Sequence, residues 1–184
     1  MSQLQDCPHC VASRPSRRTV IAGLTAAAVL PATPLAAAAP AQADDERFMR
    51  IAIDEARRGD FPFGAVIVRG GKILARGRNL GRTTHDPTAH GEMVAIRRAL
   101  ASHGPTALKG ATLYTSGEPC AMCMGAILWC GFGRMVFAAS VEQLATKINQ
   151  IMVSSAELAA KTSFVPIAIT GGVLADDAMK LFKT

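Results

Sequence analysis

Two short motifs bring together side-chain types that bind a transition metal. His90 and Glu92 are separated by one glycine, and Cys120 and Cys123 follow about thirty residues later. Cysteines at positions i and i+3 lie on the same side of a helix, so both sulfur atoms can reach one ion. One histidine and two cysteines make a three-ligand zinc site. Such a site is typical of catalytic zinc, because the fourth position stays open for water.

Glu92 is the candidate proton carrier of such a site. Zinc lowers the pKa of bound water to about 7, and the reaction then needs a carboxylate that moves protons beside it. Two residues along a helix correspond to about 200° of rotation, so periodicity alone does not aim Glu92 and His90 at the same point. Taken alone, Glu92 is equally compatible with a solvated acid at a helix start.

Two non-enzymatic classes of protein stay open at this point. A zinc-stabilised module would need a fourth protein ligand and would tolerate the loss of Glu92. A thiol redox protein would use Cys120 and Cys123 as a reversible disulfide and would not need His90. Zinc content separates the redox protein from the other two. The activity of a Glu92→Gln variant that keeps its zinc separates an enzyme from a structural module.

The elements that must position these residues alternate between helices and short apolar strands. Gly70-Gly71 between two apolar runs predicts a β-hairpin, and Thr88 is expected to cap the helix that carries Glu92. Pro166 indicates that the last strand lies at a sheet edge. The predicted helices cover residues 45–58, 88–102, 120–129, 141–144, 156–160 and 176–182, and the predicted strands cover 65–68, 73–75, 111–115, 134–138 and 164–169. This alternation predicts an α/β layered domain.

The two motifs together match the H-x-E…P-C-x-x-C signature of zinc nucleobase deaminases. From about Phe61 to Phe137 the chain resembles the cytidine and deoxycytidylate deaminase-like superfamily, and most of all the branch with guanine, cytosine and tRNA adenosine deaminases. The usual alanine between the two motif residues is Gly91 here. The resemblance is also carried by the segments Phe63-Gly64-Ala65-Val66, Gly77-Arg78-Asn79, Asp86-Pro87-Thr88-Ala89, Leu113-Tyr114-Thr115-Ser116 and Gly117-Glu118-Pro119-Cys120.

The resemblance implies a three-layer α-β-α fold, with a five-stranded mixed sheet between helices on both faces, and a homodimer. It implies one Zn²⁺ per chain, with Glu92 passing protons between water, a ring nitrogen and departing ammonia. The substrate base would be read by the backbone N–H of Gly91 and the amide of Asn79. Phe63 and Trp129 occupy positions that wall the base pocket in the family. The metal ligands it implies are His90, Cys120 and Cys123.

A free base or nucleoside is the expected substrate, with guanine first and cytosine next. A transfer RNA substrate is less expected, because the chain ends without a basic extension and its charge of +6 forms no clear basic stripe. Phe182 is the one aromatic candidate for a C-terminal tail that closes the pocket. We expect no nucleic-acid partner.

The first 43 residues have the layout of an export signal. An arginine-containing segment precedes an apolar run at residues 20–30, and Ala41-Gln42-Ala43 has the small-x-small pattern of a cleavage site. The apolar run is too short for a permanent membrane anchor, which needs about 20 residues. Arg17-Arg18 before the run resembles a twin-arginine signal; a chance pair in an ordinary signal is the alternative. We expect residues 1–43 to be removed and the deaminase domain, residues 44–184, to be periplasmic or secreted.

The remaining histidines and cysteines are expected to be structural. Five cysteines in 184 residues are too few for a disulfide-built miniprotein. Cys7-Pro8-His9-Cys10 lies inside the expected leader and has no second ligand pair. Cys130 is expected to be a core thiol and His85 and His103 to lie at the surface. The Arg97-Arg98 pair is interpreted as part of a solvated helix face.

Overall fold

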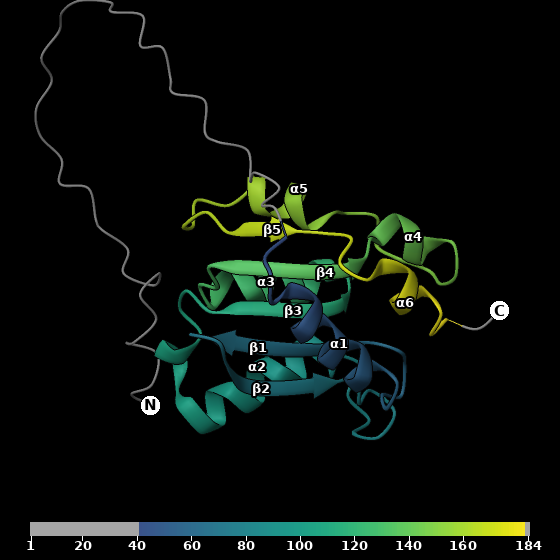
Figure 1. Cartoon of the computed structure of the whole chain (residues 1–184), viewed down its shortest axis with the longest axis horizontal. Helices are drawn as coiled ribbons and strands as arrows, with labels where there is room; N and C mark the ends of the chain where they lie inside the picture. Colours follow the sequence, from purple (N-terminus) through teal and green to yellow (C-terminus); the bar gives the residue numbers. More distant parts are fainter. Residues whose placement is uncertain (1–40, 183–184) are drawn as a thin grey trace, which may run out of the picture. The chain divides into compact units, whose positions relative to one another are not determined.

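The computed structural model describes residues 41–182, which form a five-stranded sheet between two layers of helices (Figure 1). The strand order is β2-β1-β3-β4-β5. The β1–β2 and β1–β3 pairs are antiparallel, whereas β3–β4 and β4–β5 are parallel, so the sheet is mixed. The strands are β1 (Gly64–Arg69), β2 (Lys72–Arg78), β3 (Thr112–Gly117), β4 (Arg134–Ala139) and β5 (Ala168–Thr170).

Six α-helices and one 3₁₀ turn accompany the sheet in the described part of the chain. They are α1 (Asp45–Ala56), α2 (Gly91–His103), η1 (Pro105–Ala107), α3 (Ala121–Trp129), α4 (Val141–Ala145), α5 (Ser155–Ala160) and α6 (Ala175–Met179). No helix within residues 41–182 is long and apolar enough to cross a membrane. The expected leader lies outside the described residues except for positions 41–43, and so does the Cys7-Pro8-His9-Cys10 motif.

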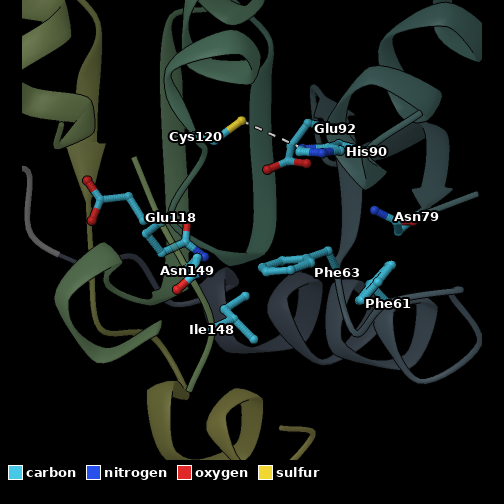
Figure 2. A pocket seen from close by; sticks show the side chains of 10 residues that line it. Phe61, Phe63, Asn79, His90, Glu92, Glu118, Cys120, Ile148 and Asn149 are labelled. Carbon is cyan, nitrogen blue, oxygen red and sulfur yellow. Dashed lines mark hydrogen bonds between the residues drawn. The ribbon is translucent and has the colours of Figure 1, made fainter. Parts of the chain in front are cut away.

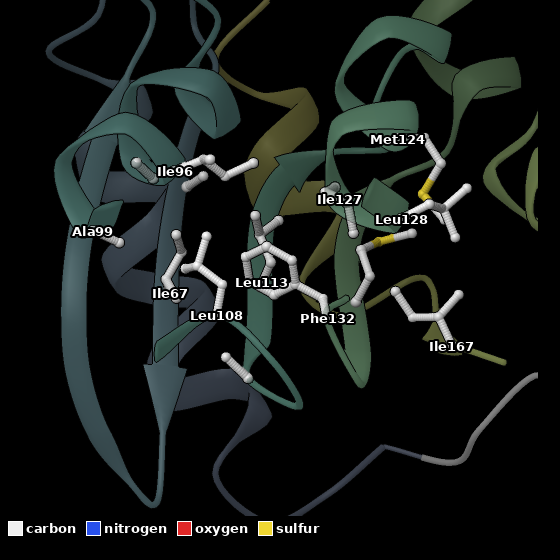
Figure 3. Packing of buried hydrophobic residues seen from close by; sticks show 14 of the residues in the cluster. Ile67, Ile96, Ala99, Leu108, Leu113, Met124, Ile127, Leu128, Phe132 and Ile167 are labelled. Atoms are coloured by element: carbon white, nitrogen blue, oxygen red, sulfur yellow. The ribbon is translucent and has the colours of Figure 1, made fainter. Parts of the chain in front are cut away.

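Each face of the sheet buries its own hydrophobic cluster, because successive strand residues point to opposite faces. On one face, Ile67 of β1 and Leu113 of β3 pack against α2 and α3 (Figure 3). On the other, the neighbouring residues Val66 and Tyr114 pack against α1, together with residues of α4 and α6. Helices therefore cover both faces, which confirms the predicted three-layer α-β-α architecture.

The predicted hairpin is confirmed, and its turn explains the two glycines. Gly70 and Gly71 connect β1 to β2 with φ values of 55° and 73°, a conformation that residues with a side chain rarely adopt. The free edge of β2 is covered by side chains of α2. Arg98 donates to the carbonyl oxygen of Arg76 at 3.0 Å, and His103 Nε2 lies 3.2 Å from the carbonyl oxygen of Leu74.

Two elements begin three or more residues later than predicted. The helix expected from Thr88 begins at Gly91, because the Thr88 hydroxyl and N–H both bond to the Asp86 carboxylate, at 2.6 and 2.8 Å, and hold a turn. The strand expected over 164–169 begins only at Ala168 and runs to residue 170. Pro166 precedes the strand, since it has no N–H to donate to a neighbour. The prediction that the last strand lies at a sheet edge is confirmed, since β5 is an outer strand of the sheet.

Candidate active site

Two helix starts meet at one end of the sheet and bring the predicted metal ligands together. His90 is the N-cap of α2 and Cys120 is the N-cap of α3, so both precede a first helical turn. The Nδ1 atom of His90 lies 3.6 Å from the sulfur of Cys120 and 3.6 Å from that of Cys123. The three ligand atoms all lie within 4.8 Å of one another.

These distances fit a zinc ion. In a tetrahedral site with Zn–S near 2.3 Å and Zn–N near 2.05 Å, a sulfur and a nitrogen ligand are separated by about 3.6 Å. Both sulfur–nitrogen distances match that value. The donor set of one imidazole and two thiols is also one that zinc prefers. His90, Cys120 and Cys123 are thus able to hold zinc with little rearrangement.

Charge interactions within the trio favour this role. Hydrogen bonds from Cys123 and His90 hold the pKa of Cys120 at about 4, against the opposing effect of burial. The Cys123 thiol donates a hydrogen bond to Cys120, and this bond, together with burial, raises the pKa of Cys123. The hydrogen bond to Cys120 also raises the pKa of His90, although burial opposes it. A thiolate at a helix start is further favoured by the helix dipole.

A turn before α2 fixes the position of His90. The carboxylate of Asp86 binds the Thr88 N–H and hydroxyl, and its second oxygen lies 3.1 Å from Arg97. Arg97 also donates to the Thr88 hydroxyl at 3.0 Å. Arg97 and Arg98 are both exposed, as predicted for a solvated helix face, and Arg97 in addition ties the turn to the helix that follows it.

Glu92 is buried beside the metal ligands. Its side chain is in the first turn of α2 and the residue is 4% exposed. Burial raises the pKa of its carboxyl group above the usual range, and the nearby Cys120 adds to this effect. The hydroxyl of Thr115 lies 3.2 Å from Glu92 Oε1. A carboxyl with a raised pKa next to a metal site is suited to accept and return a proton.

His90, Cys120 and Glu92 open into a cavity of about 220 Å³. Figure 2 shows Phe61, Phe63 and Asn79 on one side, and Glu118, Ile148 and Asn149 across from them. The lining consists of Phe61, Phe63, Asn79, His90, Glu92, Glu118, Cys120, Ile148, Asn149 and Gln150. The volume is below the 300–1,000 Å³ of pockets for drug-sized ligands, and so suits a small ligand.

Two of the predicted substrate contacts line this cavity. Asn79 is buried, and its Oδ1 accepts the Gly81 N–H at 3.1 Å, which leaves the amide nitrogen directed toward the cavity (Figure 2). The ring of Phe63 lies at the side of the cavity, and its centroid is 5.4 Å from that of Phe182. Gly117 leaves room for the ring, since a Cβ there would approach Phe63 to 2.9 Å. Phe182 thus contacts a lining residue but does not itself line the cavity.

The other two predicted contacts lie elsewhere. Trp129 does not line the cavity, contrary to the sequence-based expectation; it is 57% exposed and its ring packs edge-on against Phe164. It is the last residue of the helix that Cys120 caps, so it is displaced from that cysteine by about 13 Å along the axis. Gly91 is buried behind the lining, where a Cβ would lie 3.0 Å from the Cα of Gly64 and from the Phe63 carbonyl oxygen. This close approach explains why glycine occupies the position.

The sequence-based analysis missed Glu118 and the loop residues of the lining. Glu118 is buried, and its two carboxylate oxygens accept the N–H groups of Val141 at 3.0 Å and Ser155 at 2.7 Å. It thereby fixes the starts of α4 and α5. Its place two residues before Cys120 could have indicated from the sequence that it lies near the metal site. Asn149 and Gln150 have no local signal, because only the packing of the α4–α5 connection brings them to the metal site.

The remaining expectations about histidine and cysteine hold in the described part of the chain. His85 and His103 are exposed. Cys130 is half-buried against the core, and burial raises the pKa of its thiol.

The family model for the cytidine and deoxycytidylate deaminase zinc-binding region matches residues 42–139, more than half of the chain. The chain belongs to this family. Among curated proteins it is 56% identical over 68 residues to guanine deaminase of Bacillus subtilis, a match that covers 37% of this chain and 44% of that protein. It is 43% identical over 99 residues to tRNA-specific adenosine deaminase of the same organism, covering 52% of this chain and 62% of that protein. The matches thus span less than two thirds of these relatives.

Solved structures agree with this family. The structure of NE0047 in complex with 2,6-diaminopurine superposes with a TM-score of 0.65 at 26% identity, and the match covers 78% of this chain and 82% of that chain. The two proteins therefore share the fold over most of their length.

Proposed function

We propose that this protein hydrolyses the C–N bond to the exocyclic amino group of a free purine base. Guanine is the favoured substrate, and its products are ammonia and xanthine. The observation that carries the proposal is the buried Glu92 carboxyl, which lies beside the metal-ligand trio at the wall of a small cavity. The similarity to a guanine deaminase and to a purine-bound structure supports the substrate class.

The lining fits a flat, neutral base. Phe61 and Phe63 offer aromatic surface, whereas Asn79, Asn149 and Gln150 offer amide donors and acceptors. Aromatic side chains pack favourably on flat rings, and amides can hydrogen-bond the edge of a base. No lysine or arginine belongs to the lining within the described residues, so nothing in it selects for a phosphate group.

Each site residue has a defined task in this reaction. His90, Cys120 and Cys123 would hold one zinc ion, which when bound supplies a water molecule activated for attack. Glu92 takes a proton from the attacking water and delivers it to the ring nitrogen next to the reacting carbon. It then takes the proton of the added hydroxyl group, as the carbonyl forms, and passes it to the amino group, which leaves as ammonia. Asn79 donates from its amide nitrogen to the base and holds it in place.

Ammonia release by the full-length protein tests the proposal directly. Guanine, cytosine, adenine and their nucleosides serve as substrates, with zinc measured in each preparation. Glu92→Gln should lower kcat at least about 100-fold while zinc stays bound, because it removes the proton carrier. Glu142→Gln is the matched control: this exposed residue of α4 makes the same chemical change away from the cavity. Zinc-loaded protein that releases no ammonia from any of these compounds would overturn the proposal.

Deamination of adenosine in transfer RNA is the second candidate, favoured by the 43% identity to a tRNA-specific adenosine deaminase. The same assay with a transfer RNA anticodon stem-loop distinguishes the two. Inosine formation in the RNA without turnover of guanine would favour this candidate.

We also propose export through a twin-arginine-type signal in residues 1–43. The support is the paired arginines before an apolar run and the small-x-small pattern at residues 41–43. Changing Arg17 and Arg18 together to lysine should retain the protein inside the cell, as judged by fractionation. Export of the double variant at the native level would contradict the twin-arginine route.

A homodimer is the proposed assembly, with one zinc ion in each chain. Large apolar side chains are exposed on the single chain, among them Met122 at 38%, Trp129 at 57% and Met152 at 56%. Exposed apolar surface of this kind favours association. Light scattering during size exclusion should give twice the mass of one chain, and Trp129→Lys should shift it toward the single chain.

A further inference from the structure

A threonine hydroxyl lies against the carboxylate of the proposed proton carrier. Thr115 is completely buried, and its Oγ1 is 3.2 Å from Glu92 Oε1. The same oxygen is 3.0 Å from the carbonyl oxygen of Gly117. A hydroxyl has one proton and two lone pairs, so it can donate to one of these oxygens at a time and can also accept from a protonated carboxyl.

The backbone that carries this hydroxyl is held from both sides. Thr115 lies on β3, the central strand of the sheet, where it pairs with Ala65 of β1 and Phe137 of β4. The side chain is β-branched and therefore restricted about χ1. Its hydroxyl is consequently held in a defined place by the sheet.

The Glu92 side chain needs a partner in a defined place. It starts from the first turn of α2, whereas His90 is the extended N-cap residue before the helix, so helix periodicity does not aim the two side chains at the same point. The Glu92 carboxylate therefore reaches the metal site through its own rotatable bonds. Proton transfer requires heavy atoms at hydrogen-bond distance, so every additional Glu92 rotamer lowers the fraction of molecules that are ready to react. A contact at Oε1 fixes the carboxylate and leaves its other oxygen for the reacting groups.

We propose that Thr115 is a positioning residue that holds Glu92 in its reactive orientation. The inference rests on the proposed function, in which Glu92 carries the protons. Thr115 does not reach the cavity itself, because it does not belong to the lining.

Three single variants of the full-length protein test this role. Thr115→Val keeps the shape and removes the hydroxyl, and Thr115→Ser keeps the hydroxyl. Thr112→Val makes the same change on the same strand, at a half-buried position away from Glu92. We expect Thr115→Val to lower kcat about 10- to 100-fold, the value of a lost hydrogen bond to a charged group, with KM within about twofold and zinc retained. Thr115→Ser should restore most of the rate, and Thr112→Val should leave it unchanged.

A double variant shows whether the effect runs through Glu92. In a Glu92→Gln background, adding Thr115→Val should cause no further loss of the residual rate, since the proton carrier is already absent. Thr115→Val could also lower the yield of folded protein. Rates are therefore compared per bound zinc, and Tm is measured for Thr115→Val and Thr115→Ser in both the wild-type and the Glu92→Gln background.

The outcomes separate the inference from the function on which it rests. An active wild type with a Thr115→Val kcat within twofold overturns the positioning role and leaves the deaminase in place. Equal loss of rate, zinc and Tm in the valine and serine variants shows a purely structural residue and overturns it too. A zinc-loaded wild type without activity on any base overturns both.

Discussion

A buried ion pair ties the start of the first helix to the middle of the sheet. The carboxylate of Asp45 meets Arg134 of β4 through two contacts of 2.6 and 2.7 Å. It also accepts the Tyr114 hydroxyl at 3.0 Å and the Gln42 N–H at 2.7 Å. Asp45 is 1% exposed and Arg134 is 7% exposed. Because the two buried charges face each other, removing one takes away the attraction that offsets the burial of the other.

Asp45→Asn should therefore destabilise the protein by about 3–5 kcal/mol, the usual effect of breaking one side of a buried pair. The amide keeps the shape, yet it replaces one acceptor oxygen by an NH₂ group that faces the donors of Arg134 or Gln42. At about 2–4 °C per kcal/mol for a chain of this size, Tm should fall by about 6–20 °C.

Thermal unfolding followed by circular dichroism measures this shift, and Asp54→Asn is the matched control. Asp54 lies on the same helix and also pairs with an arginine at 2.6 Å, but the Asp54 and Arg57 side chains are 58% and 57% exposed. An exposed pair contributes at most about 1 kcal/mol, so the control should lower Tm by no more than about 3 °C. Equal shifts in the two variants would refute the reasoning, because burial would then make no difference to the pair.

Four further outcomes follow from the same structure. Burial raises the pKa of Asp45, but its hydrogen bonds and its pairing with Arg134 outweigh burial, so the pKa is lowered. The ionised Asp45 carboxylate therefore contributes fully to folding stability above its ordinary pKa of about 3.9, and this contribution is lost as the pH falls below that value. Tm should drop steeply in acid, and less steeply for Asp45→Asn. Gly77→Ala should lower both Tm and the rate of ammonia release, because a Cβ there collides with the carbonyl oxygen of Gly91 and displaces the start of α2. Cys120→Ser should reduce zinc per chain, as metal analysis would show; full zinc content would count against this ligand. Asn79→Asp keeps the bond to the Gly81 N–H and loses the amide donor, so KM for guanine should rise about tenfold in steady-state assays.

The metal ligands could be found from the sequence because their chemistry fixes both type and spacing. His90 and Cys120 are the N-caps of α2 and α3, and Cys123 lies in the first turn of α3. These positions bring the three ligand atoms within 4.8 Å of one another, although the start of α2 differs from the predicted one. The α/β class followed from the alternation of predicted helices and strands, whereas the three-layer arrangement followed from the family resemblance. The structure shows both, with Ile67 and Val66 of β1 in the two different cores.

Other features depend on contacts that no local pattern reveals. Thr88 has the type of a helix cap, but the nearby Asp86 side chain competes for its N–H and hydroxyl and delays the helix. Asn149 lies in the loop after α4 and lines the cavity. Glu118, which directly follows β3, accepts the Val141 N–H and so holds the start of α4 in place. Trp129 has the residue type of a pocket wall, yet the direction of α3 carries it away from the cavity.

The cover that α2 provides over β2 has a consequence for solubility. An outer strand normally offers unpaired carbonyl and N–H groups, which can recruit a strand from another molecule and begin aggregation. Here Arg98 and His103 already engage the carbonyl oxygens of Arg76 and Leu74 on that edge. The opposite edge, β5, has only three residues and offers little template. The sheet is thereby protected from edge-to-edge growth by the same helix that carries Glu92.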